Sequence, residues 1–385
     1  MSFLDTLTSA FKGGGSARVP LRQGFTSPWA MALGGSAHPP PFDYAVAIRR
    51  GFIANPIAQR AVRIVAEGVG QAPLLVSDPQ VQRLVSATSA GQSLIETLAA
   101  QLLLHGNGYV QIIKDGQGRP VELFALRPER VTLVPGSDGW PRAYEYRVGE
   151  QRIAIPVEDE AGWPGIIHIK AMHPADDHYG AGALAAADQS IAIHNAACAW
   201  NRALLENAAR PSGALVHDAP DGAGLTGEQF ERLKAELASA YSGQGNAGRP
   251  MVLDGGLKWQ SMALSPADMD FAELKSAAAR DIALAFGVPP MLLGLPGDNT
   301  YANYREANRA LWRLTLLPLA TKLFSALQEG LAPWFPEARI AVDLDLVPAL
   351  SEDRERLWTQ VSEAGFLTDA EKRAILGIDA KEMMP

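Results

Sequence analysis

The sequence predicts an α+β protein built from more than one packed unit. Residues 42–172 alternate amphipathic helical patterns with short runs rich in β-branched and aromatic residues, which is typical of a mixed α+β domain. Residues 180–210 are alanine-rich and lack an internal proline, which predicts one long helix. The chain has 385 residues, of which 36 are Gly and 27 are Pro, so it is long enough for two or three units with many bends.

Composition excludes some classes of protein. A formal net charge of −8 argues against a protein that reads DNA sequence, because such proteins neutralise phosphates with clustered Lys and Arg. An acidic surface is compatible with a channel through which a duplex moves. The lone Cys198 cannot form an internal disulfide, and residues 1–12 lack the pattern of a secretory signal, so we expect a cytosolic origin and no membrane span.

The first segments can be assigned in order. Residues 1–41 include a Gly, Ser and Pro-rich stretch and predict an extended arm. A helix should begin at Asn55-Pro56 and end before Pro73, since asparagine caps helices and proline fits the first turn. A second helix is expected over residues 92–105. The predicted buried faces are Ile57, Ala61, Ile64, Val65 and Val69 in the first helix, and Leu94, Ile95, Leu98, Leu102 and Leu103 in the second.

Short strands should follow. Residues 108–126 predict a hairpin around the turn 115–118, because two β-rich runs flank Asp-Gly-Gln-Gly. Further strands are expected at 131–134, 143–148 and 165–170.

After the long helix, residues 211–265 predict a compact insert. It should contain a strand near 214–216, a helix opened by the capping box Thr226 to Gln229, and two strands over 250–264. Ser265-Pro266 should open the next helix. Its predicted inward side chains are Phe271, Leu274, Ala278, Ile282 and Phe286.

The last third should be mainly helical. A helix over 302–331 is expected to be interrupted at Pro318, which lacks a backbone N–H. A strand over 339–346 and two short helices should follow, one capped at Ser351 and one by the box Thr368 to Glu371 with its end at Gly377.

One segment combines three unlike parts. The double proline at 289–290 should end the preceding helix, and a short apolar patch and a polar loop follow it. The patch is Met291, Leu292 and Leu293, and the loop is Gly297, Asp298, Asn299, Thr300 and Tyr301.

The candidate catalytic residues do not form a convincing site. Imidazoles and carboxylates ligate zinc and iron, so a metal-dependent hydrolase is one alternative function. The spacing of five residues does not place the histidines on one helical face, and Pro174 interrupts the run. The residues concerned are His168, His173, Asp176, Asp177 and His178.

Other enzyme signatures are missing from the sequence. No Walker motif, HExxH or GxSxG occurs, so we expect no enzymatic activity, no cofactor and no metal. A peripheral membrane or scaffold protein anchored by Phe3, Leu4, Leu7 and Phe11 is a third interpretation, which the shortness of that apolar stripe weakens.

Seven stretches follow one another along the chain: NPIAQRAVRIVAEGVGQAPL, LLLHGNGYVQIIKDGQGRPVELFALRPERV, IIHIKAMHPADDHYGAGALAAA, NAARPSGAL, NAGRPMVLDGGLKWQSMALSPADMDF, IALAFGVPPMLLGLPGDNTYANY and LLPLATKLFSALQEGL. In these stretches and in their order, the chain resembles the HK97-type portal proteins of tailed bacteriophages, from about residue 44 to 378. It is similar in its compactness to portals of prophages or gene transfer agents.

This resemblance implies a division of the chain into regions. They are an arm (1–41), a mixed α/β wing (42–182), a stem helix (183–210), a small α/β clip (211–265), a second stem helix (266–290), a tunnel loop (291–304), a long kinked helix with a wing strand (305–350) and a helical crown (351–385).

The resemblance also implies a function. A ring, usually of twelve subunits, would occupy one capsid vertex of a virion or gene-transfer particle assembled in the bacterial cytoplasm. Double-stranded DNA would pass through it, independently of sequence, and the large terminase, a head-tail adaptor and the major capsid protein would be partners. The residues from Gly297 to Tyr301 would face the DNA, and Met291, Leu292 and Leu293 would pack between subunits.

Overall fold

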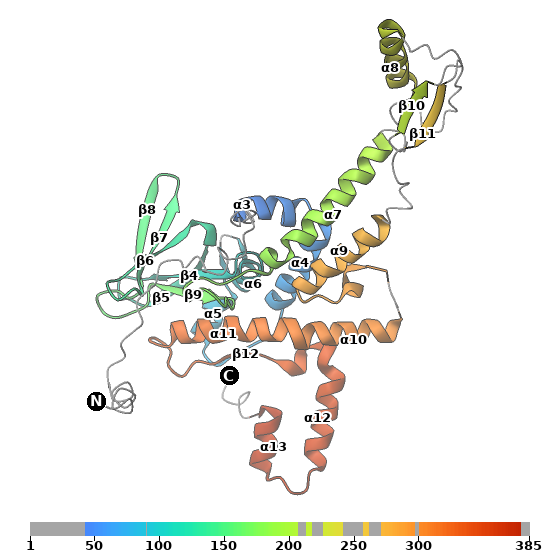
Figure 1. The fold of residues 1–385 in the computed structure, drawn as a ribbon. Helices are drawn as coiled ribbons and strands as arrows, with labels where there is room; N and C mark the ends of the chain where they lie inside the picture. The colour runs from blue at the N-terminus through green and yellow to red at the C-terminus, as the bar shows by residue number, and fades with distance from the viewer. Residues whose placement is uncertain are drawn as a thin grey trace, which may run out of the picture. The chain divides into compact units, whose positions relative to one another are not determined.

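The computed structural model describes residues 43–89, 91–206, 213–217, 226–241, 257–261, 271–296 and 300–378 (Figure 1). They divide into two compact units. Unit 1 comprises the chain up to Ala45, Val62–Ala185 and the chain from Asn308, and unit 2 comprises Val46–Ala61 and Ala186–Ala307. Helices and strands are mixed along the chain, so the predicted α+β class is confirmed. The expected arm, residues 1–41, lies outside the described residues.

The N-terminal helices follow the predicted capping. Asn55 Oδ1 accepts a hydrogen bond from Ala58 N at 2.9 Å, so the asparagine caps the predicted first helix. In that helix Ala61, Val65 and Val69 are buried, as predicted, whereas Ile57 and Ile64 are half-buried. The elements are α3 (Tyr44–Ala47), the π-helix η1 (Ile48–Ile53), α4 (Pro56–Gly70), β1 (Leu74–Val76), α5 (Pro79–Ser86), and β2 and β3 (Thr88–Ser89 and Gln92–Ser93). Three short helical segments in this region, α3, η1 and α5, were not predicted.

Two three-stranded antiparallel sheets make up most of the β structure of unit 1. The first has the order β5-β4-β9 and the second β6-β7-β8. The predicted hairpin is confirmed, whereas β8 was missed because one of its six side chains, Ile155, is buried and the rest are exposed. The bounds are β4 (Asn107–Lys114), β5 (Pro120–Leu126), η2 (Pro128–Arg130), β6 (Val131–Pro135), β7 (Pro141–Val148), β8 (Gln151–Pro156) and β9 (Ile166–Lys170).

One apolar cluster joins the two sheets. Its buried members come from strands of both sheets, and burying them removes apolar surface from water. They are Tyr109, Leu126, Val131, Tyr144, Ile155 and Ile166.

Two helices cover the first sheet. Both α6 (Leu94–Leu104) and α11 (Leu317–Leu331) contact it (Figure 1). A Cβ at Gly330 would lie 2.4 Å from Ile167 Cγ1, so the glycine lets α11 approach β9 closely. The predicted face of α6 was wrong at one position, because Leu104 is buried and Leu103 is half-buried.

The expected interruption near Pro318 takes the form of a π-helical turn. Helix α10 (Tyr301–Leu311) continues into η5 (Trp312–Leu316) and then α11, and Leu317 N bonds to Trp312 O. Proline has no N–H, so the wider turn accommodates the missing bond. By length and composition alone, Tyr301–Leu331 could cross a membrane, but five of its apolar side chains are buried within unit 1: Ala320, Leu323, Phe324, Leu327 and Leu331.

The predicted strand over 339–346 is shorter than expected. Only β12 (Ile340–Val342) is extended, and it pairs antiparallel with β1. The side chain of Asp343 accepts a bond from Asp345 N at 3.1 Å and starts the 3-10 helix η6 (Leu344–Leu346), which ends the strand.

A helical pair closes the chain. After η7 (Pro348–Leu350) come α12 (Ser351–Glu363) and α13 (Asp369–Leu376), which contact each other (Figure 1). The capping box at Thr368 and the left-handed Gly377 are confirmed. Ser351 is not a cap as predicted, because its Oγ donates to Pro348 O instead of accepting a bond from the helix.

Unit 2 holds the long helix, the insert and the return helix. The alanine-rich helix is confirmed, and Thr226 and Gln229 form the predicted capping box. The predicted strand at 250–256 and the Ser265-Pro266 cap lie outside the described residues. Leu274 is 44% exposed, which contradicts its predicted inward position. The elements are α7 (Ala183–Glu206), β10 (Gly213–His217), α8 (Gly227–Tyr241), β11 (Leu257–Ser261) and α9 (Phe271–Ala285), and β10 pairs antiparallel with β11.

Buried asparagines connect distant segments within each unit. In unit 2, Asn55 Nδ2 donates to Asn195 Oδ1 at 2.8 Å, Asn195 Nδ2 donates to Arg50 O at 3.0 Å, and Arg50 pairs with Asp188. These bonds hold residues 50–55 against α7.

In unit 1 we define the Asn107 cluster as Gly106, Asn107, His168, Gly180 and Gly182. Asn107 Oδ1 accepts from Gly180 N at 2.8 Å and lies 3.0 Å from His168 Nε2, and Asn107 Nδ2 donates to Gly180 O at 3.2 Å. The glycine backbones are in close contact, because a Cβ at Gly180 would lie 2.0 Å from Gly106 O.

The close approach in the Asn107 cluster makes a testable prediction. A methyl group at Gly180 must displace backbone atoms, so Gly180→Ala should lower the free energy of unfolding by about 3 kcal/mol or more. The matched control is Gly116→Ala, where an added Cβ meets nothing within 4 Å. Denaturant unfolding of both variants checks this, and equal stabilities would contradict the predicted crowding.

Candidate functional site

The first candidate site is the segment 287–301, which includes most of the tunnel loop predicted over residues 291–304 and which we call the tunnel-loop segment. It begins where α9 ends in a left-handed glycine: Gly287 has φ +66°, Gly287 N bonds to Leu284 O at 3.0 Å, and Val288 N bonds to Ala283 O at 2.9 Å. A glycine there satisfies carbonyls of the last helical turn without steric cost. The double proline follows this cap, so the helix ends at glycine and the prolines fix the chain beyond it.

A 3-10 turn, η4 (Pro290–Leu293), follows the double proline. Gly294 has φ +74° and ends it, and Leu295 N bonds to Pro290 O at 3.3 Å. The turn contacts α9 in the same unit. Met291, Leu292 and Leu293 are half-buried, so each keeps apolar surface in contact with solvent in the single chain.

Both ends of the polar loop are anchored. Arg280 Nη2 donates to Pro296 O at 2.5 Å, and Thr300 Oγ1 accepts from Asn303 N at 3.2 Å, which makes Thr300 the cap of α10. Gly297, Asp298 and Asn299 lie outside the described residues and connect these two fixed points. Spacing along the sequence could not reveal the role of Arg280, because its partner is sixteen residues away.

The described end of the loop is exposed and aromatic. Tyr301 is 79% exposed, and the Arg305 guanidinium carbon lies 5.7 Å from the centroid of its ring. Exposed tyrosine, threonine hydroxyl and a single nearby cation can make weak contacts with a polyanion. The described residues of this segment contain no histidine, cysteine or paired carboxylate, so they offer no acid-base pair.

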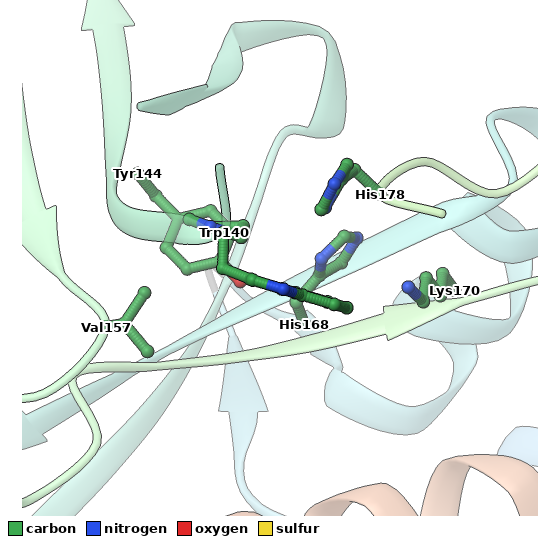
Figure 2. Close-up of a pocket in the computed structure, with 7 residues that line it drawn as sticks. Trp140, Tyr144, Val157, His168, Lys170 and His178 are labelled. Atoms are coloured by element: carbon green, nitrogen blue, oxygen red, sulfur yellow. The ribbon is translucent and has the colours of Figure 1, made fainter. Parts of the chain in front are cut away.

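A second candidate is the His168 pocket, a cavity of about 380 Å³ shown in Figure 2. His168 projects from β9, its ring stacks on Tyr109 with centroids 4.3 Å apart, and Trp140 meets His178 edge to face. Lys170 Nζ donates a hydrogen bond to the backbone carbonyl of Asp177. The lining residues are Trp140, Pro141, Tyr144, Val157, His168, Lys170 and His178.

The pKa of His168 is lowered to about 3, chiefly by burial and then by the nearby Lys170, His178 and His105. Burial also raises the pKa of Tyr144 to about 12 and raises that of Tyr109. The lowered pKa keeps His168 neutral at physiological pH, which is the state that costs least to bury, and the raised pKa values keep the Tyr109 and Tyr144 hydroxyls protonated.

The metal-site alternative gains no support from this geometry. His173 Nδ1 accepts from Ala175 N at 3.1 Å, and Asp176 Oδ1 accepts from His178 N at 2.7 Å and from Tyr179 N at 2.9 Å. The side chains of His173 and Asp176 thus accept hydrogen bonds from the backbone of local turns. Across the part of the chain that the structure describes, no three His, Cys, Asp or Glu side chains converge as ligands.

Comparison with a solved structure identifies the class of fold. The crystal structure of an HK97 family phage portal protein from Corynebacterium diphtheriae aligns with a TM-score of 0.56. It is 15% identical, and the alignment covers 78% of this chain and 98% of that one. The fold is therefore that of an HK97-type portal.

Sequence comparison identifies the family. Residues 56–377 match the family model described as phage portal protein, so the chain belongs to the phage portal protein family. The resemblance drawn from the sequence is confirmed. An uncharacterized protein of Rickettsia felis is 40% identical over 337 residues, which is 84% of this chain and 86% of that protein.

A second solved structure is more similar in sequence. It is that of the neck of a native gene transfer agent (GTA) particle, computed with C12 symmetry. Its matching chain is 46% identical with a TM-score of 0.67, and the alignment covers 93% of this chain and 98% of that one.

The neutral His168 makes the stability of unit 1 sensitive to acid. The unfolded chain takes up a proton below the ordinary pKa of 6.5, whereas folded His168 does not until about 3. Between these values the unfolded state binds more protons than the folded state. The free energy of unfolding therefore decreases as the pH is lowered, by about 2 kcal/mol from pH 7 to pH 5.

Replacing His168 by Gln, which can still bond to Asn107, should remove this part of the acid sensitivity. Denaturant unfolding at pH 7 and pH 5 measures it in the original chain and the variant. Burial also lowers the pKa values of His105 and His194. These two histidines contribute equally to the pH dependence of unfolding in both proteins. The same pH dependence in both would show that His168 is not held neutral.

Proposed function

We propose that this chain assembles into a closed ring of twelve subunits at the portal vertex of a gene-transfer or phage particle and forms the passage for double-stranded DNA. The observation that carries the proposal is the 46% identity to a chain in the neck of a GTA particle with C12 symmetry. Membership of the phage portal protein family supports the same role. A gene-transfer particle is preferred over a phage virion, because the chain is 46% identical to the GTA chain and 15% identical to the HK97 family phage portal protein.

Simple geometry supports a ring of this size. Helices about 10 Å across, twelve of them side by side, give a circumference of about 120 Å and a bore of roughly 28 Å. A duplex fits through such an opening. A closed ring uses heterologous contacts, so each subunit needs two different contact surfaces.

In this proposal the tunnel-loop segment lines the channel. Gly297, Asp298, Asn299, Thr300 and Tyr301 face the DNA, and Met291, Leu292 and Leu293 bury their remaining apolar surface against a neighbouring subunit. The anchoring by Arg280 and Thr300 keeps the loop short and fixed at both ends. Weak contacts with phosphates suit transport, because a strongly basic loop would hold the duplex in place.

The other regions take the family's roles. Helices α7 and α9 form the stem, and the insert with β10, α8 and β11 forms the clip, which meets the large terminase and later a head-tail adaptor. The sheets of unit 1 form the wing, near the major capsid protein, and α12 and α13 form the crown. The protein then acts as a structural channel and not as a hydrolase.

The ring makes a first prediction for this function. Twelve copies of a 41.1 kDa chain have a mass of about 490 kDa. Mass photometry of the purified full-length chain should show this species, and negative-stain images should show a central hole. A compact monomer at all protein concentrations, with or without capsid protein, would count against the ring.

The loop makes a second prediction. Replacing Asp298 and Asn299 by Gly retains the Thr300 cap, so ring assembly should be unchanged while packaged DNA per particle falls severalfold. The matched control replaces Glu150 and Gln151, two exposed residues at the β7–β8 turn, by Gly. DNA protected from nuclease in purified particles is the measurement. Normal packaging by the loop variant would remove these residues from the mechanism.

A further inference from the structure

A surface cleft in unit 1 is unrelated to the tunnel-loop segment. It has a volume of about 540 Å³ and lies where the β4–β5 turn meets the segment after α11. Trp163, Trp334 and Phe335 form its aromatic wall, and Pro120 and Pro333 add flat apolar surface. The rings of Trp163 and Trp334 lie 4.7 Å apart at an angle of 30°. We call this site the aromatic cleft.

The walls of the aromatic cleft are held in place before anything binds. Lys114 Nζ donates to Asp159 Oδ2 at 2.7 Å and lies 5.2 Å from the centroid of the Trp334 ring. Trp334 Nε1 donates to Gly118 O at 2.8 Å. Because these side chains are already ordered, binding a ligand costs them little conformational entropy, and this lower cost favours binding.

Two turns of the same design form the rim. Asp115 Oδ1 accepts from Gln117 N at 2.8 Å and Arg119 N at 2.9 Å, and Asp159 Oδ1 accepts from the backbone N–H groups of Ala161 and Trp163 at 2.9 Å. In each turn the fourth residue is a glycine with positive φ, Gly118 at +79° and Gly162 at +78°. The rim is thus rigid on both sides.

The chemistry of the cleft matches a proline-rich segment. Preformed aromatic grooves bind polyproline II segments, because proline rings stack on aromatic faces and the extended backbone presents free carbonyls to donors. Within the described residues no hydrogen bond uses the indole N–H of Trp163, which leaves a donor on a lining residue.

The chain itself carries such a segment. Residues 37–42 read AHPPPF, and Pro39 to Pro41 form the sole run of three prolines in the sequence. Phe42 alone separates this run from the first described residue, Asp43.

The same copy cannot supply this segment. Tyr44 packs against His105, two residues before the start of β4, whereas the cleft lies past the other end of β4. That strand extends about 24 Å. Pro39 is five residues before Tyr44 and reaches at most about 18 Å. A Pro39–Pro41 segment that reaches the cleft therefore has to belong to another copy.

We propose that the aromatic cleft binds the Pro39–Pro41 segment of a second copy of this chain, so that the N-terminal arm joins neighbouring subunits. The inference goes beyond the proposed ring and shares with it only the requirement that copies meet.

The first test uses a synthetic peptide of residues 35–43, GSAHPPPFD. The full-length chain with Pro39 to Pro41 replaced by Gly has no competing arm, so its tryptophan fluorescence should change saturably with added peptide. A peptide with three Gly in place of the prolines should not bind. Trp163→Ala should weaken binding about tenfold or more. The control Trp200→Ala changes an exposed tryptophan of α7 and should bind normally. Equal binding of the proline and glycine peptides would overturn the inference.

The second test asks which copy supplies the arm. In a Cys198→Ser background, one chain carries Ala37→Cys and the other Gln117→Cys, and a short bis-maleimide is added to the mixture. Covalent pairs between the two chains are expected, and few with the control Gln151→Cys on the exposed β8 strand. Rings that form without this cross-link would overturn the inference and leave the proposed ring intact. A cross-link without rings would support the inference and count against the ring.

Discussion

The contact between the glycine backbones of the Asn107 cluster determines how unit 1 is organised. The start of β4 and the chain just before α7 approach so closely that neither Gly106 nor Gly180 has room for a side chain. Asn107 satisfies both the N–H and the carbonyl of Gly180, which would otherwise be buried without partners. His168 from the adjacent strand completes the cluster, so the sheet, the His168 pocket and the first residue of α7 have fixed positions relative to one another within this unit.

A buried asparagine has the same function in unit 2. Asn55 caps α4 with its carbonyl oxygen and bonds to α7 with its amide nitrogen, and it is fully buried. An amide can satisfy donors and acceptors together without carrying charge, so it costs less to bury than an ion pair. Because apolar contacts alone do not specify register, these directional bonds fix α7 against residues from early in the chain.

Local patterns in the sequence predicted local structure well. The Asn55-Pro56 start, the hairpin around residues 115–118 and the capping boxes at Thr226 and Thr368 depend on residues a few positions apart, and the structure has them. The predictions were wrong where the structure depends on contacts between residues far apart in the sequence or on burial. Strand 339–346 is cut short at Asp343, and β8 has too few buried side chains to show an alternating pattern. The Arg280 anchor and the aromatic cleft join residues far apart in sequence, so spacing could not reveal them; the roles of Gly297 to Tyr301 stay a prediction.

Unit 2 of the single chain exposes apolar side chains that suit a contact with a neighbouring subunit. Leu284 is 78% exposed at the end of α9, and Tyr301 is 79% exposed at the start of α10. Between them in sequence, Met291, Leu292 and Leu293 are half-buried on a turn fixed by two prolines and a left-handed glycine. Rigid backbone with unburied apolar side chains is what a heterologous contact requires, because little entropy is lost when a neighbour covers it. In the proposed ring, the same contact would also hold Arg280 and Thr300, so assembly would fix the position of the loop without any need for the loop to bind DNA tightly.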